Sequence, residues 1–330
     1  MQNGEGLPRA LNAEELLKAA LENRPDEGEL SRFVGSFPQA TFFHTTAWLD
    51  SLEAALPRFG PAWLTVRRGS GLAGVMPVVR ASRGPVHFLL SLPFGTYGHP
   101  LAIDADAERT LLDGFFGMAR SPLCAEAAVN LFSGGSAAAP GGVRTVMEEC
   151  RLVSLDGGFE AAWNAVSSKR RQLCRRGEEA GVAVRPIESE DEVRSFHDLY
   201  RAESEPWGGV HPYPLALFLE LFRRRERGVI VWGAYLGETL LGAHIDFYHG
   251  GMAQAWQGGM AERGKEYEAG ALLIKGAMAE ACRRGMSLFN LGSSVGNVGL
   301  LFFKESLGGR ERRYPVCSAA KSWWRLVRRR

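Results

Sequence analysis

Apolar and polar residues follow the same order in two separate passages of the chain. Residues 62–79 alternate as two strands around a glycine-containing turn, and residues 229–248 repeat that pattern. Each passage follows a stretch whose apolar residues fall on one face of a helix, at 46–56 and at 213–222. The passages match in the order of their elements and not in their residues. They predict a duplicated unit of helices and mainly antiparallel strands.

We therefore expect an α/β (α+β) fold with two domains in tandem, each a mixed, mainly antiparallel sheet flanked by helices. The first domain is expected at 31–150 and the second at 151–316, with a basic connecting helix at 159–181 inside the second. A chain of 330 residues, of which 45% are apolar and 23% charged, is long enough for two ordinary globular domains.

The two ends of the chain are expected to lie outside these domains. Asn12 and Glu15 have the spacing of a capping box, which predicts a peripheral helix within residues 1–30 that runs to about Glu22. Residues 317–330 are predicted to form a basic tail with interleaved aromatic residues. Such a tail could touch RNA or an anionic membrane surface, or it could only keep the chain in solution.

Composition and spacing argue against several functions. Five cysteines without a CxxC pair fit free thiols in a reducing cytoplasm better than disulfides or a zinc site. Seven histidines show no ligand spacing, so we expect no metal site. No apolar run approaches the roughly 20 residues that cross a bilayer, and no signal-peptide core is present. We expect a cytoplasmic protein, with peripheral contact at the inner face of the membrane as an option for the tail.

Positive charge is concentrated in the predicted connecting helix, at Lys169, Arg170, Arg171, Arg175 and Arg176. Arg171 and Arg175 are four residues apart and share a helix face, which could hold a phosphate through bidentate hydrogen bonds. A solvated basic helix that pairs with Glu178 and Glu179 explains the same residues equally well. The sequence leaves both interpretations open.

The stretch from Leu288 to Gly309 has the strongest signs of a site. A short apolar strand breaks at a segment rich in glycine, serine and asparagine, and an apolar run then leads to Lys304. Glycine and asparagine tolerate the positive φ of tight turns, and a lysine behind such a loop can reach an anion. A solvated lysine at the end of a strand is the simpler alternative.

Two other places have side chains that could line a pocket. The loop at 93–100, PFGTYGHP, is long for a hairpin turn and is either a pocket wall or a loop packed by its own rings. His244 and Asp246 alternate with apolar residues on one predicted strand and therefore share a face. They could line a cleft, or they could be polar members of a half-solvated strand.

Five segments occur in the order of a known family's motifs. They are FHTTAWLDSL and LPFGTYGHPL in the first half, SSKRRQLCRRGEEAGV and HPYPLALFLELF in the middle, and FNLGSSVGNVGLLFFKESLGG followed by Tyr314. In this order they resemble the FemAB-like proteins of the acyltransferase superfamily with the GNAT fold, which include proteins encoded beside exosortase systems. The resemblance covers about residues 40–316.

The resemblance implies two GNAT-like domains in tandem, with an active cleft in or near the second. FemAB-like enzymes move an acyl or aminoacyl group onto an amine; some take amino acids from aminoacyl-tRNA to peptidoglycan precursors, and other relatives are assigned as acyl-CoA-dependent. We therefore expect an N-acyltransferase with acyl-CoA or aminoacyl-tRNA as co-substrate and no tightly bound cofactor. Its acceptor would be a small-molecule or nucleotide-linked amine of the cell envelope or its polysaccharides.

Particular residues take roles under this hypothesis. Lys304 and Tyr97 are the predicted catalytic residues: Lys304 would stabilise developing negative charge or a donor phosphate, and Tyr97 would shape the pocket. The predicted substrate-binding residues are Arg171, Arg175, Tyr213, Gln257, Ser293 and Asn297.

The chain also departs from the family's pattern. Asn290 stands where an acidic residue is usual, Ser293 where arginine is common, and Leu307 where tryptophan is usual. Related enzymes cradle the pyrophosphate of acetyl-CoA at a helix start; the corresponding residues here have different spacing and are Arg263, Gly264 and Gly270. The departures at Asn290 and Ser293 support an alternative function, a catalytically inactive GNAT-fold protein that binds or scaffolds in envelope polysaccharide biosynthesis.

Overall fold

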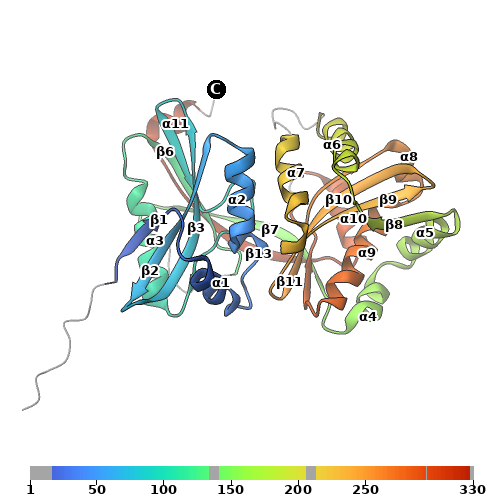
Figure 1. Cartoon of the computed structure of the whole chain (residues 1–330), viewed down its shortest axis with the longest axis horizontal. Coiled ribbons are helices and arrows are strands. Elements are labelled where there is room, and N and C mark those ends of the chain that lie inside the picture. Colours follow the sequence, from blue (N-terminus) through green and yellow to red (C-terminus); the bar gives the residue numbers. More distant parts are fainter. Residues whose placement is uncertain (1–16, 134–140, 206–212, 295, 328–330) are drawn as a thin grey trace, which may run out of the picture.

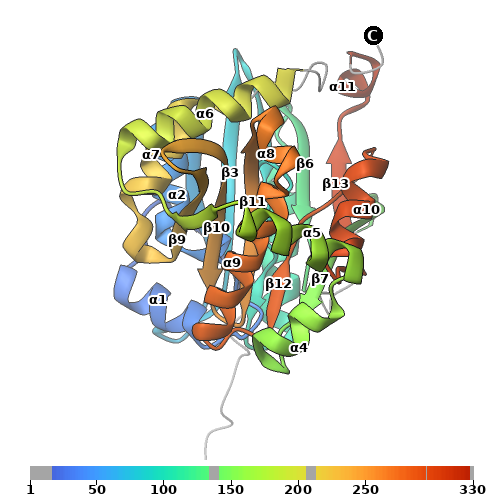
Figure 2. The same cartoon turned by 90° about the vertical axis from the view of Figure 1, so that its right-hand side faces the viewer.

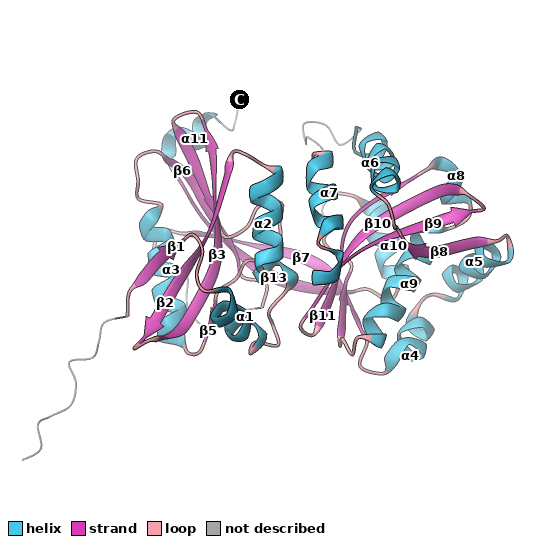
Figure 3. Cartoon of the chain, in the orientation of Figure 1, coloured by secondary structure: helices cyan, strands magenta, loops and turns pink. Residues whose placement is uncertain are grey.

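Strands from both halves of the chain join in one sheet in the computed structural model of the protein, which describes residues 17–133, 141–205, 213–294 and 296–327 (Figures 1 and 3). The sheet order is β1-β2-β3-β4-β6-β13-β7-β12-β11-β10-β9-β8, and β5 pairs with β3. The strands are β1 (Ala19–Glu22), β2 (Phe59–Arg68), β3 (Gly71–Arg83), β4 (Val86–Leu90), β5 (Leu101–Ala102), β6 (Cys124–Asn130), β7 (Arg144–Ser154), β8 (Val182–Pro186), β9 (Val229–Leu236), β10 (Thr239–His249), β11 (Met252–Met260), β12 (Leu288–Asn290) and β13 (Arg310–Ala320).

Helices lie on both faces of this sheet (Figure 2). They are α1 (Glu27–Gly35), α2 (Thr46–Ala55), α3 (Ala105–Met118), α4 (Gly158–Ala165), α5 (Ser168–Glu179), α6 (Glu190–Ser204), α7 (Leu215–Arg223), α8 (Glu262–Glu266), α9 (Ala269–Arg283), α10 (Val298–Ser306) and α11 (Ser322–Val327), with short 3-10 turns at η1 (Phe42–His44) and η3 (Arg225–Arg227).

The order of the strands confirms the predicted duplication. In the first copy β1 to β4 are antiparallel neighbours and β4 pairs in parallel with β6; in the second copy β8 to β12 repeat this arrangement. A parallel pair needs a crossover connection, which contains α3 in the first copy and α9 in the second. Asn130 and Asn290 are the last residues of the equivalent strands β6 and β12. The fold is therefore two copies of one α/β unit.

The two copies exchange their last strands. β7 follows the first copy in the sequence but pairs with β12 of the second, whereas β13 follows the second copy but pairs with β6 of the first. The two strands also pair with each other in the middle of the sheet. The expected domain boundary between residues 150 and 151 thus falls inside β7, because one strand serves both copies.

The predictions for the ends of the chain were partly wrong. Ala19–Glu22 form strand β1 beside β2, so the helix predicted to run to Glu22 is a strand in its described part. Asn12 and Glu15 lie outside the described residues. The expected tail from residue 317 begins inside β13, and helix α11 follows it. Pairing of β1 with the edge of β2 overrides the capping pattern that predicted a helix. Pairing of β13 with β6 makes the first residues of the predicted tail part of the sheet.

Aromatic packing fills the junction between the copies. α2 of the first copy lies beside α7 of the second (Figure 1). Phe42 stacks on Phe247 with 4.4 Å between ring centroids, and Trp48 meets Trp256 edge-on at 5.4 Å. Full burial of such a side chain contributes roughly 1.5–3 kcal/mol. The junction is therefore part of the hydrophobic core, while α9 covers a second cluster on the other face of the second copy.

Two further searches cover only the described part of the chain. No helix there has both the length and the apolar character that a bilayer crossing requires. No three histidine, cysteine, aspartate or glutamate side chains in those residues are grouped so that they could hold a metal ion.

We expect removal of residues 310–330 to unfold both copies. The deletion removes β13, which is the hydrogen-bonded neighbour of both β6 and β7. Circular dichroism should show that the whole chain loses its cooperative thermal transition. A matched deletion of residues 322–330 leaves β13 intact and should keep that transition. A chain without β13 in which the first copy still melts cooperatively would contradict the exchange.

Candidate active site

An opening forms where two parallel strands part. β11 and β12 pair over three residues only, from Met252 with Leu288 to Gln254 with Asn290, and β11 then continues to Met260 without β12 beside it. The chain turns away at Gly292, whose φ of 76° is a left-handed conformation that favours glycine. The glycine-rich segment therefore opens the sheet beside β11.

Helix α10 returns the chain to this opening and places Lys304 in it. Asn297 caps the helix by accepting a hydrogen bond from the Leu300 amide at 2.9 Å. The Lys304 side chain is buried, 8% exposed, and its Nζ donates to the Ser293 carbonyl at 2.6 Å. No carboxylate of the described residues forms an ion pair with it. The alternative of a solvated lysine at the end of a strand is therefore wrong.

The charge on Lys304 is held in an unfavourable environment. Burial, together with the nearby Arg151 guanidinium, lowers the pKa of Lys304 to about 8, against a smaller opposing effect of Cys150. Arg151 is itself buried and is neutralised by carboxylates on three sides, at 3.3 Å from Glu149, 3.4 Å from Glu305 and 3.8 Å from Glu311. Because those three carboxylates pair with Arg151, they do not form ion pairs with the Lys304 ammonium.

Tyr97 of the first copy reaches the same place. Asn290 Nδ2 donates to the Tyr97 hydroxyl at 3.0 Å, and Asn290 Oδ1 accepts from the Gly292 amide at 2.8 Å. Tyr97 is buried and stacks on Phe132 with 4.0 Å between centroids. Burial raises the pKa of Tyr97 well above its usual value, so the phenol stays neutral. Tyr97 therefore supports the loop through Asn290, at the position where the family's pattern has an acid.

Cys150 of β7 lies against Tyr97 in this buried group. Burial raises the pKa of the Cys150 thiol to about 11, although the Tyr97 hydroxyl and three cations nearby act to lower it. A thiol with that pKa is protonated near neutral pH and is a poor nucleophile. The site therefore contains no activated cysteine at this position, and direct attack by a substrate amine needs none.

Gln254 belongs to the site and was missed by the sequence analysis, which selected Gln257 from the same strand. A Cβ atom placed on Gly292 would lie 3.7 Å from Lys304 Nζ and 3.8 Å from Gln254 Nε2, so both side chains converge on this glycine. Gln254 Nε2 donates to the Ala255 carbonyl at 2.8 Å, whereas its buried Oε1 has no hydrogen-bond partner among the described residues. The same holds for the buried hydroxyl of Ser294.

Gln257 lies beyond a register shift in the pairing of β10 and β11, where it faces Ile245. An alternating pattern fixes which residues share a face only while the register is regular. The irregularity lies between the two glutamines, and sequence periodicity alone could not choose between them.

The basic helix α5 uses its arginines inside the fold. Arg171 Nη1 donates to the carbonyls at the end of α4, at 2.6 Å from Asn164 and 2.5 Å from Val166. Arg170 pairs with Glu268 and lies over the Phe303 ring at 5.0 Å. Arg175 is exposed. Arg171 therefore caps the end of α4. Its guanidinium is not free in the way that the exposed Arg175 is.

The predicted pyrophosphate cradle has a different structure. Arg263 and Gly264 lie in the short helix α8, and a Cβ on Gly264 would come within 2.2 Å of the Leu241 carbonyl, so this glycine is needed for close packing. Gly270 lies in the first turn of α9, which is preceded by Glu268. A carboxylate at that helix start, paired with Arg170, disfavours a second anion there. These residues do not fit a pyrophosphate cradle.

The remaining predicted residues lie in different parts of the structure. The Tyr213 ring stacks on Trp256 at 5.2 Å and contacts Phe94 at 4.4 Å, so it bridges the two copies as part of the core. Ser293 contributes its backbone carbonyl to Lys304, and Asn297 caps α10. The structure thus brings Lys304, Tyr97 and Ser293 together, with Asn297 at the helix start behind them.

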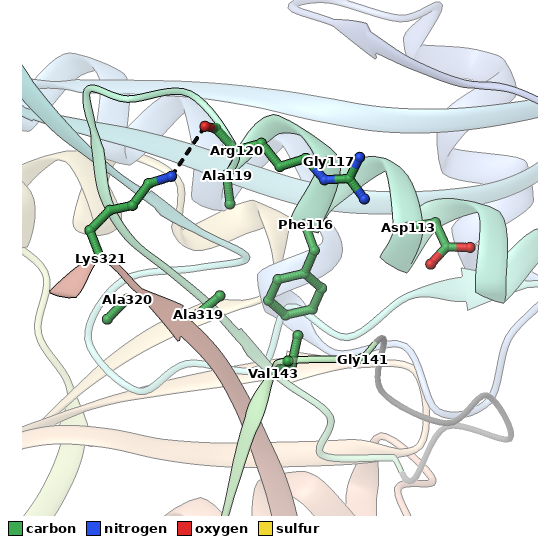
Figure 4. Close-up of a pocket in the computed structure, with 11 residues that line it drawn as sticks. Asp113, Phe116, Gly117, Ala119, Arg120, Gly141, Val143, Ala319, Ala320 and Lys321 are labelled. Carbon is green, nitrogen blue, oxygen red and sulfur yellow. Dashed lines mark hydrogen bonds between the residues drawn. The ribbon is translucent and has the colours of Figure 1, made fainter.

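Pockets elsewhere on the surface are separate from this site. One of about 600 Å³ lies between the end of α3 and β13, where Lys321 Nζ donates to the Arg120 carbonyl at 3.1 Å beside Phe116 (Figure 4). A smaller one of about 330 Å³ lies at the end of α9, beside Cys282 and Ser287. Each pocket lies near the end of the crossover helix of its copy.

Comparison with known proteins identifies the class. Residues 164–299, which lie in the second copy, match the family described as acetyltransferase (GNAT) domain. The strand order of the first copy is the same, and the fold as a whole is that of tandem GNAT proteins. No curated protein matches the sequence significantly.

Three solved structures share this fold over nearly their whole length. FemX superposes with a TM-score of 0.71 at 11% identity, over 94% of this chain and 99% of that one. The C-terminal domain of a putative lysylphosphatidylglycerol synthetase from Agrobacterium fabrum gives a TM-score of 0.56 at 15% identity, over 93% and 96% of the two chains. A tandem GNAT protein from the clavulanic acid biosynthesis pathway gives 0.53 at 15%, over 92% and 98%. The resemblance to FemAB-like proteins is confirmed at the level of the fold.

We expect Arg171→Ala to lower the free energy of unfolding by about 1–2 kcal/mol, because charge-assisted hydrogen bonds to the end of α4 are lost. Arg175→Ala removes the same charge from an exposed position on the same helix and should change stability by less than about 0.5 kcal/mol. Urea denaturation of both variants measures the difference. Equal effects of the two substitutions would show that the capping contacts contribute nothing.

Proposed function

We propose that this protein is an N-acyltransferase that moves an acyl or aminoacyl group from an activated donor to an amine. The observation that carries the proposal is the buried Lys304 ammonium at the parting of β11 and β12, whose partner is a backbone carbonyl and which forms no ion pair with a carboxylate of the described residues. Burying a charge is costly unless it is compensated. Such an arrangement is suited to a site in which a negatively charged group of the reacting substrate compensates the buried ammonium during the reaction.

The chemistry follows from these positions. A substrate amine attacks the acyl carbon directly, and negative charge develops on the carbonyl oxygen. Lys304 stabilises that charge, and its electrostatic effect is strong because the site excludes most water. Asn290 and Tyr97 hold the Gly292 turn in place. The unpaired oxygens of Gln254 and Ser294 are acceptors for the N–H groups of a bound substrate.

One structural feature bears on the class of donor, and the likeness in fold to solved structures bears on the class of acceptor. Glu268 at the start of α9 disfavours a pyrophosphate at that helix, which favours an aminoacyl ester such as aminoacyl-tRNA over acyl-CoA as donor. The likeness in fold to FemX and to a lysylphosphatidylglycerol synthetase domain supports an acceptor from the cell envelope or its polysaccharides. A cytoplasmic enzyme, with its tail at the inner face of the membrane, is consistent with such an acceptor.

A second candidate is a GNAT-fold scaffold without catalysis. It is favoured by the direct hydrogen bond between Lys304 and the Ser293 carbonyl, which occupies the ammonium in this conformation, and by Asn290 in place of an acid. In that case the opening would bind a ligand and transfer nothing.

We expect Lys304→Met to reduce transfer at least about 100-fold, the effect typical of losing an oxyanion donor. Its thermal transition should stay at the same temperature or rise slightly, because a buried ammonium is replaced by an apolar chain of similar length. The control is Lys321→Met, which removes a lysine that donates to the Arg120 carbonyl far from the opening. Steady-state kinetics with the donor identified by the ligand test below measures both variants. Undiminished turnover in Lys304→Met would refute the assignment.

The pH dependence of stability tests the buried charge without a substrate. Lys304 has a folded pKa of about 8 and an ordinary unfolded value of 10.5, so the unfolded chain binds more protons between these pH values. Its contribution to the free energy of unfolding therefore rises as pH increases from about 8 to 10.5. Lys304→Met should lose this rise, so its stability relative to the native protein should be highest near pH 7. A pH-independent difference would show that the ammonium is not buried in solution.

We expect an activated donor to raise the melting temperature of the purified protein in a saturable way, because a ligand that binds the folded state stabilises it. The ligands to compare are acyl-CoA, aminoacyl-tRNA and nucleotide-linked sugars, with free CoA and deacylated tRNA as matched controls. Stabilisation by aminoacyl-tRNA, followed by transfer, supports the enzyme. Stabilisation by the sugar nucleotides alone, without transfer in the presence of either donor, supports the scaffold.

A further inference from the structure

The residue that precedes α9 is a glutamate in an unusual backbone conformation. Glu268 has a φ of 56°, and among the described residues Phe94 is the other non-glycine residue with a positive φ. The Glu268 carbonyl accepts hydrogen bonds from the amides of Ala271 and Leu272 at 3.0 Å each, so this conformation starts the helix. Glycine adopts such a φ without strain, whereas a residue with a side chain does not. The Glu268 side chain is therefore held at a position where the backbone alone favours glycine.

Helix α5, and not the amides of α9, holds the Glu268 carboxylate. Arg170 Nη1 donates to Glu268 Oε2, and both side chains are 19% exposed. The carboxylate accepts no capping hydrogen bond from α9. A Cβ on Gly177 would lie 2.5 Å from the Tyr267 carbonyl, so α5 is packed directly against the residue before Glu268. Because salt screens a mostly buried pair weakly, the packing of α5 fixes a negative charge at the start of α9.

Arg170 also connects this helix start to α10, the helix that carries Lys304 and lies beside α5 in Figure 2. Arg170 Nε donates to Ser306 Oγ at 3.1 Å, and the guanidinium lies over the Phe303 ring, 5.0 Å from its centroid. A Cβ on Gly270 would lie 3.7 Å from Phe303 Cζ, so this ring packs against the first turn of α9. Side chains of α5 and α10 therefore cover the start of α9.

A CoA donor does not fit this helix start. Related enzymes hold the pyrophosphate of CoA at the start of a helix, where the amides and the helix dipole favour an anion. Before α9 a fixed carboxylate precedes those amides, and it already neutralises the nearby guanidinium of Arg170. A pyrophosphate would be repelled by Glu268 and would have to break the ion pair before it could use Arg170. The charge at this position therefore opposes the ligand that the fold implies.

We propose that the ion pair of Arg170 and Glu268 selects the class of donor: it excludes CoA, so the acyl group arrives on a donor that places no phosphate at the start of α9. This inference rests on the acyl transfer proposed above and names the residues that decide between its donors. Without the Glu268 carboxylate, Arg170 would be a mostly buried cation with no ion-pair partner beside the helix amides. Such an arrangement attracts an anion. One substitution should therefore convert an excluding helix start into one that binds CoA.

The test measures the binding of free CoA to the full chain by isothermal titration calorimetry. We expect no saturable binding to the native protein up to about 1 mM, the upper end of ordinary substrate affinities. Glu268→Gln should bind CoA at least about tenfold more tightly, because one like charge is removed from the helix start. Glu268→Gly, which also relieves the left-handed backbone, should bind at least as well. Increasing salt should weaken the gained binding, as expected for contacts with phosphate.

Matched controls identify the contact that is responsible. Glu178→Gln removes a different carboxylate of α5, the partner of Lys275 in α9, and should leave CoA binding unchanged. Arg170→Gln combined with Glu268→Gln removes the guanidinium as well and should lose the gained affinity. Pantetheine, which has the arm of CoA without its phosphates, should bind no better to Glu268→Gln than to the native protein.

The outcomes separate this inference from the proposed function. Native protein that binds CoA saturably, or that transfers from acyl-CoA, overturns the exclusion and leaves acyl transfer intact. Variants at Glu268 that keep a cooperative thermal transition but bind CoA no better than the native protein also overturn it. Native protein that transfers from neither donor, together with Glu268 variants that gain CoA binding, overturns the proposed function and leaves the exclusion intact.

Discussion

Hydrogen bonds along β7 and β13 hold the two copies of the fold in one sheet, and the geometry of the site depends on this exchange. β7 places Cys150 and Arg151 next to Lys304, and β13 places Tyr314 against Tyr97. With these strands in the centre, a residue of the first copy can form a buried hydrogen bond to Asn290 of the second. Two copies joined only by a surface contact would not fix that bond, because interfaces between independent domains are usually more polar and mobile.

Equivalent positions in the two copies have different roles: structural packing in the first copy and the proposed chemistry in the second. Both equivalent strands end in asparagine and continue with leucine, at Asn130 and Asn290. The next residue is Phe132 in the first copy, and its ring packs on Tyr97. In the second copy it is Gly292, which has no side chain and leaves room for Lys304. The first copy is therefore filled by aromatic rings at this position, whereas the second copy has the opening that contains Lys304.

The sequence was sufficient for features that local patterns determine. The repeated order of strands and helices predicted the duplication, and the glycine-rich break before Lys304 predicted a backbone-lined site. The contacts of individual side chains could not be predicted as well from the sequence. Arg171 is occupied by the carbonyls of α4, and Gln254 rather than Gln257 reaches the opening, because helix ends and a register shift decide these contacts. The pairing of His244 with Asp246 was visible as a shared face, but its burial was not.

The exchange of strands could not be deduced from periodicity, because β13 is separated from its partner β6 by almost the whole second copy. It also has a consequence for synthesis on the ribosome. The strand that completes the interior of the sheet is made last, so β6 keeps an unpaired edge while the second copy is being translated. Such an edge is a template for incorrect pairing. During translation, the edge of β6 therefore stays unpaired until β13 has been made.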